Sequence, residues 1–158
     1  MHAGMVSQLL LLLVIANGVP ALIGLLSGTR CNRPLDGGHY YTDGRPLLGP
    51  SKTWRGLFSA LLATSLLAPL IDLPIMTGAG FALLAMLGDS GSSFIKRRIG
   101  LASGRSVPLL DQLPESVLPL CGMQAALHAG LDEMALAVCL FILIDLLLTQ
   151  ALKITRKY

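Results

Sequence analysis

Polar residues that could bind a metal and a phosphate group interrupt an apolar segment of this chain. The sequence is mostly apolar from Ile75 onward, and Asp89, Ser93 and Lys96 then follow at positions i, i+4 and i+7. On one continuous helix these three side chains share a face. The face offers a carboxylate that can bind a metal ion, a hydroxyl donor and an ammonium group that can neutralise a phosphate.

A second acid, Asp111, ends the polar loop that follows, where the chain returns to apolar sequence. We therefore expect Asp89 and Asp111 at the same boundary of the apolar layer, beside the consecutive bases Lys96, Arg97 and Arg98. Mg²⁺ takes one or two carboxylates and completes its octahedron with phosphate oxygens and water. The pattern thus predicts a Mg²⁺ site at Asp89 and Asp111. The residues alone leave another interpretation open, in which each acid pairs with a nearby arginine.

Glycines and bases also gather in the polar loop at residues 27–52. Clustered glycines let backbone N–H groups approach an anion closely. Ser51 or Thr53 could cap the helix that follows, which would place Lys52 and Arg55 beside its positive N-terminal end. This arrangement predicts a phosphate cradle, although the spacing of a Walker A loop is absent. A solvated basic loop is the alternative.

The elements that must position these residues are membrane helices. Of the 158 residues, 53% are hydrophobic and 13% are charged. A soluble domain would carry roughly twice that share of charge, so the apolar excess must face lipid. Most of the long apolar segments approach the roughly 20 residues that cross a bilayer. These segments are residues 5–26, 57–71, 75–95, 113–131 and 134–152.

We therefore predict an all-α, polytopic integral membrane protein with five transmembrane helices, folded as a single domain over residues 1–158. All 12 bases fall in the two polar loops, at the start of the segment after the first loop, or in the tail after residue 152. The positive-inside rule then places both loops and the C-terminus in the cytoplasm and the N-terminus outside. The expected location is the cell membrane, plasma or inner, with the active site facing the cytoplasm. Such a basic face suits acidic lipid heads and nucleotide phosphates.

Two further polar residues lie within apolar segments. Asn17 is in the inner half of the first segment, and Asp145 is in the last, at a depth near that of Asp89. A buried amide or carboxylate at this depth needs a partner. These residues predict an internal polar cavity that opens inward. Asp145 could instead be a structural residue that is protonated or hydrogen-bonded.

A series of motifs between residues 16 and 113 carries a family resemblance. The segment at 93–97, Ser-Phe-Ile-Lys-Arg, resembles the Ser-x-x-Lys-Arg core of the CDP-diglyceride synthase signature. The full series resembles the CDP-archaeol synthase family. It comprises Ala-Asn-Gly at 16–18, Pro-Leu-Asp-Gly-Gly at 34–38, Asp-Gly-Arg at 43–45, Gly-Pro-Ser-Lys-Thr-Trp-Arg-Gly at 49–56, Gly-Asp at 88–89 and Asp-Gln-Leu at 111–113. Where the family continues with another Asp, this chain has Pro114 followed by Glu115.

The resemblance implies a membrane cytidylyltransferase for phospholipid biosynthesis. It would use CTP and Mg²⁺ to convert an isoprenoid ether-lipid phosphate, of the bis-geranylgeranylglycerol phosphate type, into a CDP-lipid with release of pyrophosphate. The implied partners are CTP, the lipid phosphate and the bilayer, and no nucleic acid is expected. The implied catalytic residues are Asp89, Lys96 and Asp111, the metal ligands Asp89 and Asp111, and the substrate-binding residues Asn17, Lys52, Arg55, Ser93, Arg97 and Arg98.

Three other functions stay open at this point. The first is the same reaction on phosphatidate or another lipid phosphate. The second is an anion transporter, because Asn17, Asp89 and Asp145 lie within the membrane. The third is a non-catalytic membrane scaffold, because Pro114 stands where the family has an acid.

Overall fold

The computed structural model describes residues 3–28, 30 and 32–155, and these residues are all helical or in loops. The described part contains no strand beyond the isolated bridges Pro34–Thr53 and Tyr40–Pro46. The predicted all-α class is therefore confirmed for it. The elements are α1 (Ala3–Ser27), α2 (Trp54–Leu67), the 3-10 helix η1 (Ala68–Ile71), α3 (Ile75–Arg98), α4 (Gln112–Gly122), α5 (Gln124–Leu127) and α6 (Leu131–Thr155).

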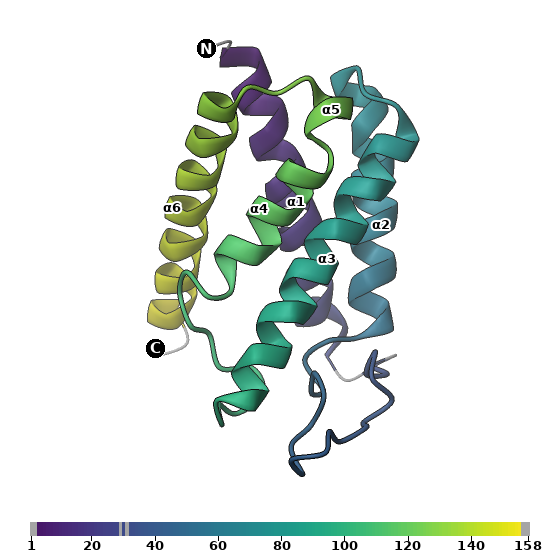
Figure 1. The fold of residues 1–158 in the computed structure, drawn as a ribbon, viewed down its shortest axis with the longest axis vertical. Coiled ribbons are helices and arrows are strands. Elements are labelled where there is room, and N and C mark those ends of the chain that lie inside the picture. The colour runs from purple at the N-terminus through teal and green to yellow at the C-terminus, as the bar shows by residue number, and fades with distance from the viewer. Residues whose placement is uncertain (1–2, 29, 31, 156–158) are drawn as a thin grey trace.

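The helices run side by side in one bundle (Figure 1). α1 packs against α2, α3 and α6, whereas α3 also packs against α2 and α4. The two polar loops, described over residues 32–53 and 99–111, lie at the same end of the bundle as the C-terminal end of α6, and α1 begins at the opposite end. Both loops therefore meet where α3 ends.

The core and the surface of the bundle suit a lipid environment. Large apolar side chains are exposed along the outside, including Leu62, Leu66 and Leu70. Water would penalise such a surface, whereas lipid would not. The core brings together Leu9, Leu12, Leu13 and Ala16 of α1 with Phe81 and Ala85 of α3, Leu120 of α4, and Ala137 and Phe141 of α6.

Two described helices are long and apolar enough by themselves to cross a membrane, namely Gly4–Ser27 and Trp54–Ile71. α3 and α6 contain 24 and 25 residues, and at 1.5 Å per residue each is about 36 Å long, which exceeds a hydrocarbon core of about 30 Å. α3 is less apolar because Gly88, Asp89 and several serines interrupt it. The count of five spans and the outside location of the N-terminus stay predictions. Two bases of the predicted cytoplasmic tail, Arg156 and Lys157, lie outside the described residues.

The segment predicted as the fourth spanning helix is divided in the structure. α4 ends at Gly122, and the short α5 follows from Gln124 to Leu127. The prediction of one helix over residues 113–131 is therefore wrong. Met123 separates the two helices with a φ of −109° and a ψ of 9°, and His128 ends α5 with a φ of 51° in the left-handed region.

The close contact between α3 and α4 depends on Gly88. A Cβ atom added at this position would overlap the backbone carbonyl of Pro114. The absence of a side chain thus lets the first turn of α4 lie directly against α3, beside Asp89. This packing brings Asp89 of α3 close to the start of α4, which follows Asp111 and carries Glu115.

Candidate active site

The first polar loop is folded around the buried side chain of Asp36. Its Oδ1 accepts a hydrogen bond from the backbone N–H of Gly38 (2.9 Å), and its Oδ2 accepts from Leu48 (2.8 Å) and Gly49 (2.9 Å). Burial alone would raise the pKa of Asp36, but these backbone donors hold the pKa below its ordinary value of 3.8. The charged carboxylate therefore fixes the loop just before Lys52. Its Asp-Gly-Gly sequence was the available signal for this role.

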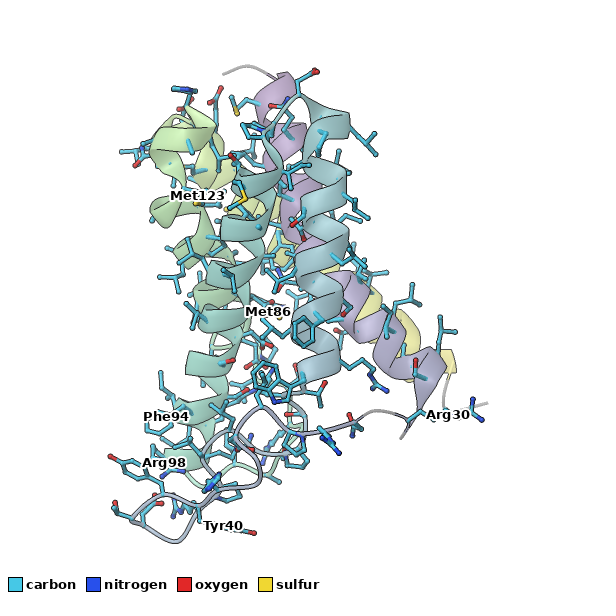
Figure 2. All side chains as sticks on the ribbon, turned by 90° about the vertical axis from the view of Figure 1, so that its right-hand side faces the viewer. Arg30, Tyr40, Met86, Phe94, Arg98 and Met123 are labelled. Carbon is cyan, nitrogen blue, oxygen red and sulfur yellow. The ribbon has the colours of Figure 1, made fainter. Side chains whose placement is uncertain are left out.

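Arg98 fastens the same loop to the end of α3. Its Nη1 donates to Oδ1 of Asp43 at 2.7 Å, and its Nη2 donates to the carbonyl of Pro46 at 2.5 Å. The guanidinium also lies 4.8 Å from the ring centre of Tyr41 and 4.9 Å from that of Phe94. Figure 2 shows Phe94 and Arg98 together at this end of the bundle, against the loop.

Lys52 leaves the loop and reaches α3. Thr53 is the N-cap of α2, where its Oγ1 accepts the backbone N–H of Gly56 at 3.2 Å. The Nζ of Lys52 lies 2.5 Å from Oδ2 of Asp89. The helix start expected near Ser51 or Thr53 thus lies at Thr53, and the neighbouring lysine pairs with the first acid of the predicted site.

The second acid pairs in the same way. Asp111 Oδ1 lies 2.5 Å from Nζ of Lys96, and Asp111 Oδ2 accepts the backbone N–H of Val107 at 3.0 Å. Lys96 also donates to the carbonyl of Arg105 at 3.2 Å. The partners of both acids are therefore lysines, not the arginines of the alternative interpretation.

Both ion pairs line adjoining cavities at the loop end of the bundle. One cavity, of about 480 Å³, is lined by Asn17, Lys52, Arg55 and Asp89 among others. A second, of about 310 Å³, is lined by Lys52, Asp89, Lys96 and Asp111. The residues common to both are Ser51, Lys52, Asp89, Glu115 and Asp145. Asp89 and Asp111, which come from different elements, thus face one shared space.

Three predicted substrate-binding residues line neither cavity. Ser93 is only 1% exposed, and its carbonyl accepts a long hydrogen bond of 3.5 Å from Arg97 Nε. Arg97 lines a separate cavity of about 190 Å³ together with Arg45 and Ser103. Arg98 contacts the first loop instead. A direct role of these three residues in substrate binding stays a prediction.

Arg55 contacts the end of α1. Its Nη1 donates to the carbonyls of Gly28 (3.1 Å) and Arg30 (2.5 Å), and the residue also lines the larger cavity. Arg30 lies far from Arg98 at this end of the bundle (Figure 2). Arg55 thus ties α1, which carries Asn17, to the start of α2.

Sequence comparison identifies the family of the chain. The family model described as CarS-like, CDP-archaeol synthase, matches residues 5–158. The chain belongs to this family. A CDP-archaeol synthase of Hyperthermus butylicus is 49% identical over 104 residues, which cover 62% of this chain and 59% of that protein. One of Staphylothermus marinus is 33% identical over 150 residues, which cover 89% of this chain and 78% of that protein.

A solved structure also resembles this member of the CDP-archaeol synthase family. It is described as an intramembrane enzyme for archaeal membrane lipid biosynthesis. The TM-score is 0.76 at 32% sequence identity, and the alignment covers 89% of this chain and 90% of the other. The coarse prediction of an all-helical membrane protein agrees with this neighbour.

The structure also shows where the departure from the family motif lies. The motif leads us to expect an acid at position 114, but Pro114 lines an apolar groove outside the polar cavities. Glu115, the next residue, lines both polar cavities. Glu115 is not among the site residues predicted above, although an acid directly after the missing one indicates it.

Asp145 is the other cavity acid absent from our predicted site. Its Oδ2 accepts a hydrogen bond of 2.6 Å from Nε2 of Gln112, which is buried at the start of α4. This hydrogen bond joins α6 to α4. The Asp-Gln-Leu motif indicated Gln112, and the depth in the last segment indicated Asp145. Their hydrogen bond to each other is a tertiary contact, which the sequence does not show.

Proposed function

We propose that this chain transfers CMP from CTP to an isoprenoid ether-lipid phosphate in the membrane, forming a CDP-lipid and pyrophosphate. Family membership and the relatives named CDP-archaeol synthase support this class of reaction. The observation that carries the proposal is the shared cavity of Asp89 and Asp111, with Lys52 and Lys96 beside them. Such a cavity offers oxygen ligands for a divalent ion and cations for a triphosphate.

The acidic residues fit a Mg²⁺ ion that is bound together with the nucleotide. Among the described residues, no group of three or more His, Cys, Asp or Glu side chains could hold a metal by itself. Mg²⁺ commonly takes only one or two carboxylates and fills its other positions with phosphate oxygens and water. We assign Asp89 and Asp111 as its ligands. When bound, the ion would draw negative charge from the triphosphate.

The chemistry requires positioning and charge stabilisation, with no protein nucleophile. An oxygen of the lipid phosphate attacks the α-phosphorus of CTP and forms a new P–O bond. The bond from the α-phosphorus to the oxygen that bridges it to the β-phosphorus breaks, and its electron pair leaves with pyrophosphate. Lys52 and Lys96 can neutralise the charge that develops on the phosphate oxygens.

The loop end of the bundle would face the cytoplasm, where CTP is available. Both polar loops lie at this end, and together with the first turn of α2 and the last turn of α3 they carry nine of the 12 bases of the chain. The lipid tails would stay in the cell membrane while the phosphate enters the cavity from the inner leaflet. Arg97 and Arg98 would then bind substrate phosphates or hold the loops that do so.

The test is CTP turnover by the purified protein in detergent or liposomes. We expect labelled CTP and an ether-lipid phosphate to give a CDP-lipid, and EDTA to stop the reaction. Asp89→Asn should lower the rate by about 10²–10³-fold, the typical cost of removing one electrostatic group from such a site. The control is Asp72→Asn, because Asp72 is exposed at the opposite end and its left-handed φ of 61° suits Asn.

Each rival function predicts a different result in this assay. Turnover of phosphatidate in preference to the ether lipid would change the substrate that we propose. A transporter would move an anion across vesicles without consuming CTP, and a scaffold would bind neither CTP nor Mg²⁺. If the wild type is active and the Asp89→Asn variant turns over CTP at the same rate, our assignment of the site is contradicted.

A further inference from the structure

A series of hydrogen bonds connects α6 to the turn that carries Asp111. Oδ2 of Asp145, on α6, accepts from Nε2 of Gln112 at 2.6 Å. Oε1 of Gln112 in turn accepts the backbone N–H of Leu109 at 3.3 Å. The Gln112 side chain therefore reaches from α6 to the backbone of the second polar loop. Asp111 lies in the chain between Leu109 and Gln112, the two loop-end residues that this series joins.

The partners of the Gln112 amide fix its orientation. A backbone N–H can only donate a hydrogen bond, so the amide atom that faces Leu109 must be the oxygen. The NH2 group then faces Asp145, whose carboxylate accepts from it. Gln112 is only 3% exposed, and a buried amide without a partner is costly. Asp145 thus supplies the acceptor that the buried NH2 group requires.

The turn at residues 107–111 has a backbone conformation that needs support from its surroundings. Leu109 has a φ of 66°, in the left-handed region that residues with a side chain rarely adopt. Such a conformation persists only where neighbouring contacts hold it. The Leu109 side chain is 54% exposed, so its packing supplies little of this support. The hydrogen bond that Leu109 donates to Gln112 is therefore one of the contacts that hold the turn.

The same turn sets the direction of the Asp111 side chain. The backbone N–H of Asp111 donates to the carbonyl of Val107 at 3.1 Å, and Oδ2 accepts the N–H of Val107 at 3.0 Å. Oδ1 lies beside Lys96, and both residues line one polar cavity. A change in the turn would thus move the carboxylate that we assign to Mg²⁺.

We propose that Asp145 is a positioning residue for Asp111. It holds Gln112, and Gln112 holds the turn at residues 107–111 in the conformation that directs Asp111 into the cavity. The inference rests on the proposed function and adds a residue of α6 to it. Displacing a site residue by about 1 Å can lower a rate by about 10²-fold, so such support from outside the site matters.

Direct action on a ligand is the competing role of Asp145, because its side chain also lines both polar cavities. In that role the negative charge must stay at position 145. Gln112 lines neither polar cavity. Moving the charge from Asp145 to position 112 therefore separates the two roles.

An exchange of donor and acceptor moves the charge in this way. Gln112→Glu alone sets two carboxylates against each other, and like charges in contact repel. Adding Asp145→Asn supplies an NH2 group that donates to the new carboxylate, so the hydrogen bond forms in the reverse direction. The second oxygen of that carboxylate can still accept the N–H of Leu109. The pair keeps one negative charge, as in the wild type.

We expect Gln112→Glu to lower kcat/KM for CTP by about 10²-fold. Asp145→Asn alone keeps a neutral acceptor for Gln112 and should lower kcat/KM only by about fivefold. In the Gln112→Glu background, however, the same Asp145→Asn change should raise kcat/KM by about tenfold or more, because the two residues act as a pair. A further loss in the double variant would overturn the proposal, since it would show that the charge at position 145 acts directly.

The Mg²⁺ dependence distinguishes positioning from a purely structural contact. Gln112→Glu should raise the Mg²⁺ concentration for half-maximal turnover by about tenfold or more, and the double variant should reverse this increase. A contact that only joins α6 to α4 would lower the unfolding temperature and leave the Mg²⁺ dependence of the folded protein unchanged. That result would also overturn the proposal.

Gln150→Glu is the matched control for the added charge. Gln150 is exposed near the C-terminal end of α6 and lines neither polar cavity. The control should match the wild type in kcat/KM and in Mg²⁺ dependence. An equal loss in Gln150→Glu would attribute the effect to charge in general and would contradict the role of the pair.

A second measurement needs neither a variant nor activity. In wild-type protein in detergent with EDTA, the backbone amide of Leu109 should exchange its hydrogen about tenfold or more slowly than that of Gly104, which is exposed in the same loop. Equal exchange would overturn the proposal, because the turn would not be held in the absence of metal and nucleotide. The two proposals fail separately. Wild type that turns over no CTP contradicts the enzymatic function, whereas active wild type without these effects contradicts only the role of Asp145.

Discussion

At the scale of single residues, each of the two aspartates in the candidate site is already paired with a lysine. Asp89 and Asp111 each have a lysine Nζ at 2.5 Å, and both pairs are partly buried. Separating such a pair is costly unless each charge finds another partner. Binding of a metal and a triphosphate would supply these partners, because the ion can take the carboxylates while the phosphates take Lys52 and Lys96. The site can therefore exchange partners without leaving a buried charge uncompensated.

Glu115 directly follows the position at which this chain departs from the family motif. If it supplies an oxygen to the metal-binding space that it lines, Glu115→Gln should raise the Mg²⁺ concentration for half-maximal activity. The expected increase is about 10–100-fold, the usual cost of losing a supporting group near a metal. A Mg²⁺ titration of CTP turnover measures it. Glu115→Asp should recover part of the loss, because it restores the carboxylate.

Asp132→Asn is the control for this change, since Asp132 is an exposed acid at the start of α6, away from the loop end. Its Mg²⁺ dependence should match the wild type. If Glu115→Gln also matched the wild type, the acid that the motif lacks would have no replacement at position 115. Glu115 would then be a structural residue of the cavity wall.

At the scale of elements, the contact between α3 and α4 sets the geometry of the site. Gly88→Ala should destabilise the protein by about 1–3 kcal/mol, because the new methyl group overlaps the backbone of Pro114 and forces the helices apart. Thermal unfolding in detergent measures this change. CTP turnover should fall with it, because α4 begins next to Asp111.

Gly91→Ala is the matched control in the same helix. Its new methyl group meets no atom within 4 Å, and alanine favours a helix over glycine by about 0.5–1 kcal/mol. We expect unfolding at an unchanged or higher temperature. Equal destabilisation by the two substitutions would contradict the close-packing explanation, because an added Cβ overlaps neighbouring atoms only at position 88 of the two.

Helical spacing predicted part of the geometry of the candidate site, and tertiary contacts determined the rest. The spacing of Asp89, Ser93 and Lys96 predicted a common face, and Asp89 and Lys96 do line one cavity. Ser93 lies on the same turns but is buried, because spacing alone does not show which part of a face a neighbouring helix covers. The partners of Arg98 are 52–55 residues distant in sequence, so no local pattern could indicate them.

The divided fourth segment shows a second limit of sequence patterns. Its apolar composition resembles that of a spanning helix, and prolines are tolerated in membrane helices when neighbours satisfy the freed backbone groups. Beside the break between α4 and α5, Gly122 packs closely against α3, where an added Cβ would lie 2.6 Å from Leu84 Cδ1. Such a contact follows from the assembled bundle and not from the composition of the segment.

At the scale of the whole molecule, polar chemistry and apolar surface are separated along the bundle. The loops, both ion pairs and the polar cavities lie at one end, and apolar side chains cover the outside of the helices. This separation suits the lipid phosphate that we propose as substrate, because the phosphate needs a polar site and the chains need apolar surroundings. The orientation of the bundle in the membrane then decides which compartment supplies the nucleotide.

We predict that the loop end, together with the C-terminal end of α6, faces the cytoplasm. The loops, the helix ends beside them and the tail after residue 152 carry all 12 bases. Translocating positively charged segments across the membrane is disfavoured. A green fluorescent protein fused after residue 158 should fluoresce, whereas alkaline phosphatase at the same position should be inactive. Alkaline phosphatase inserted at the turn before α6, near Gly130, should be active. The reverse pattern would place the cavities outside, away from cytoplasmic CTP, and would contradict the proposed function at the level of the whole molecule.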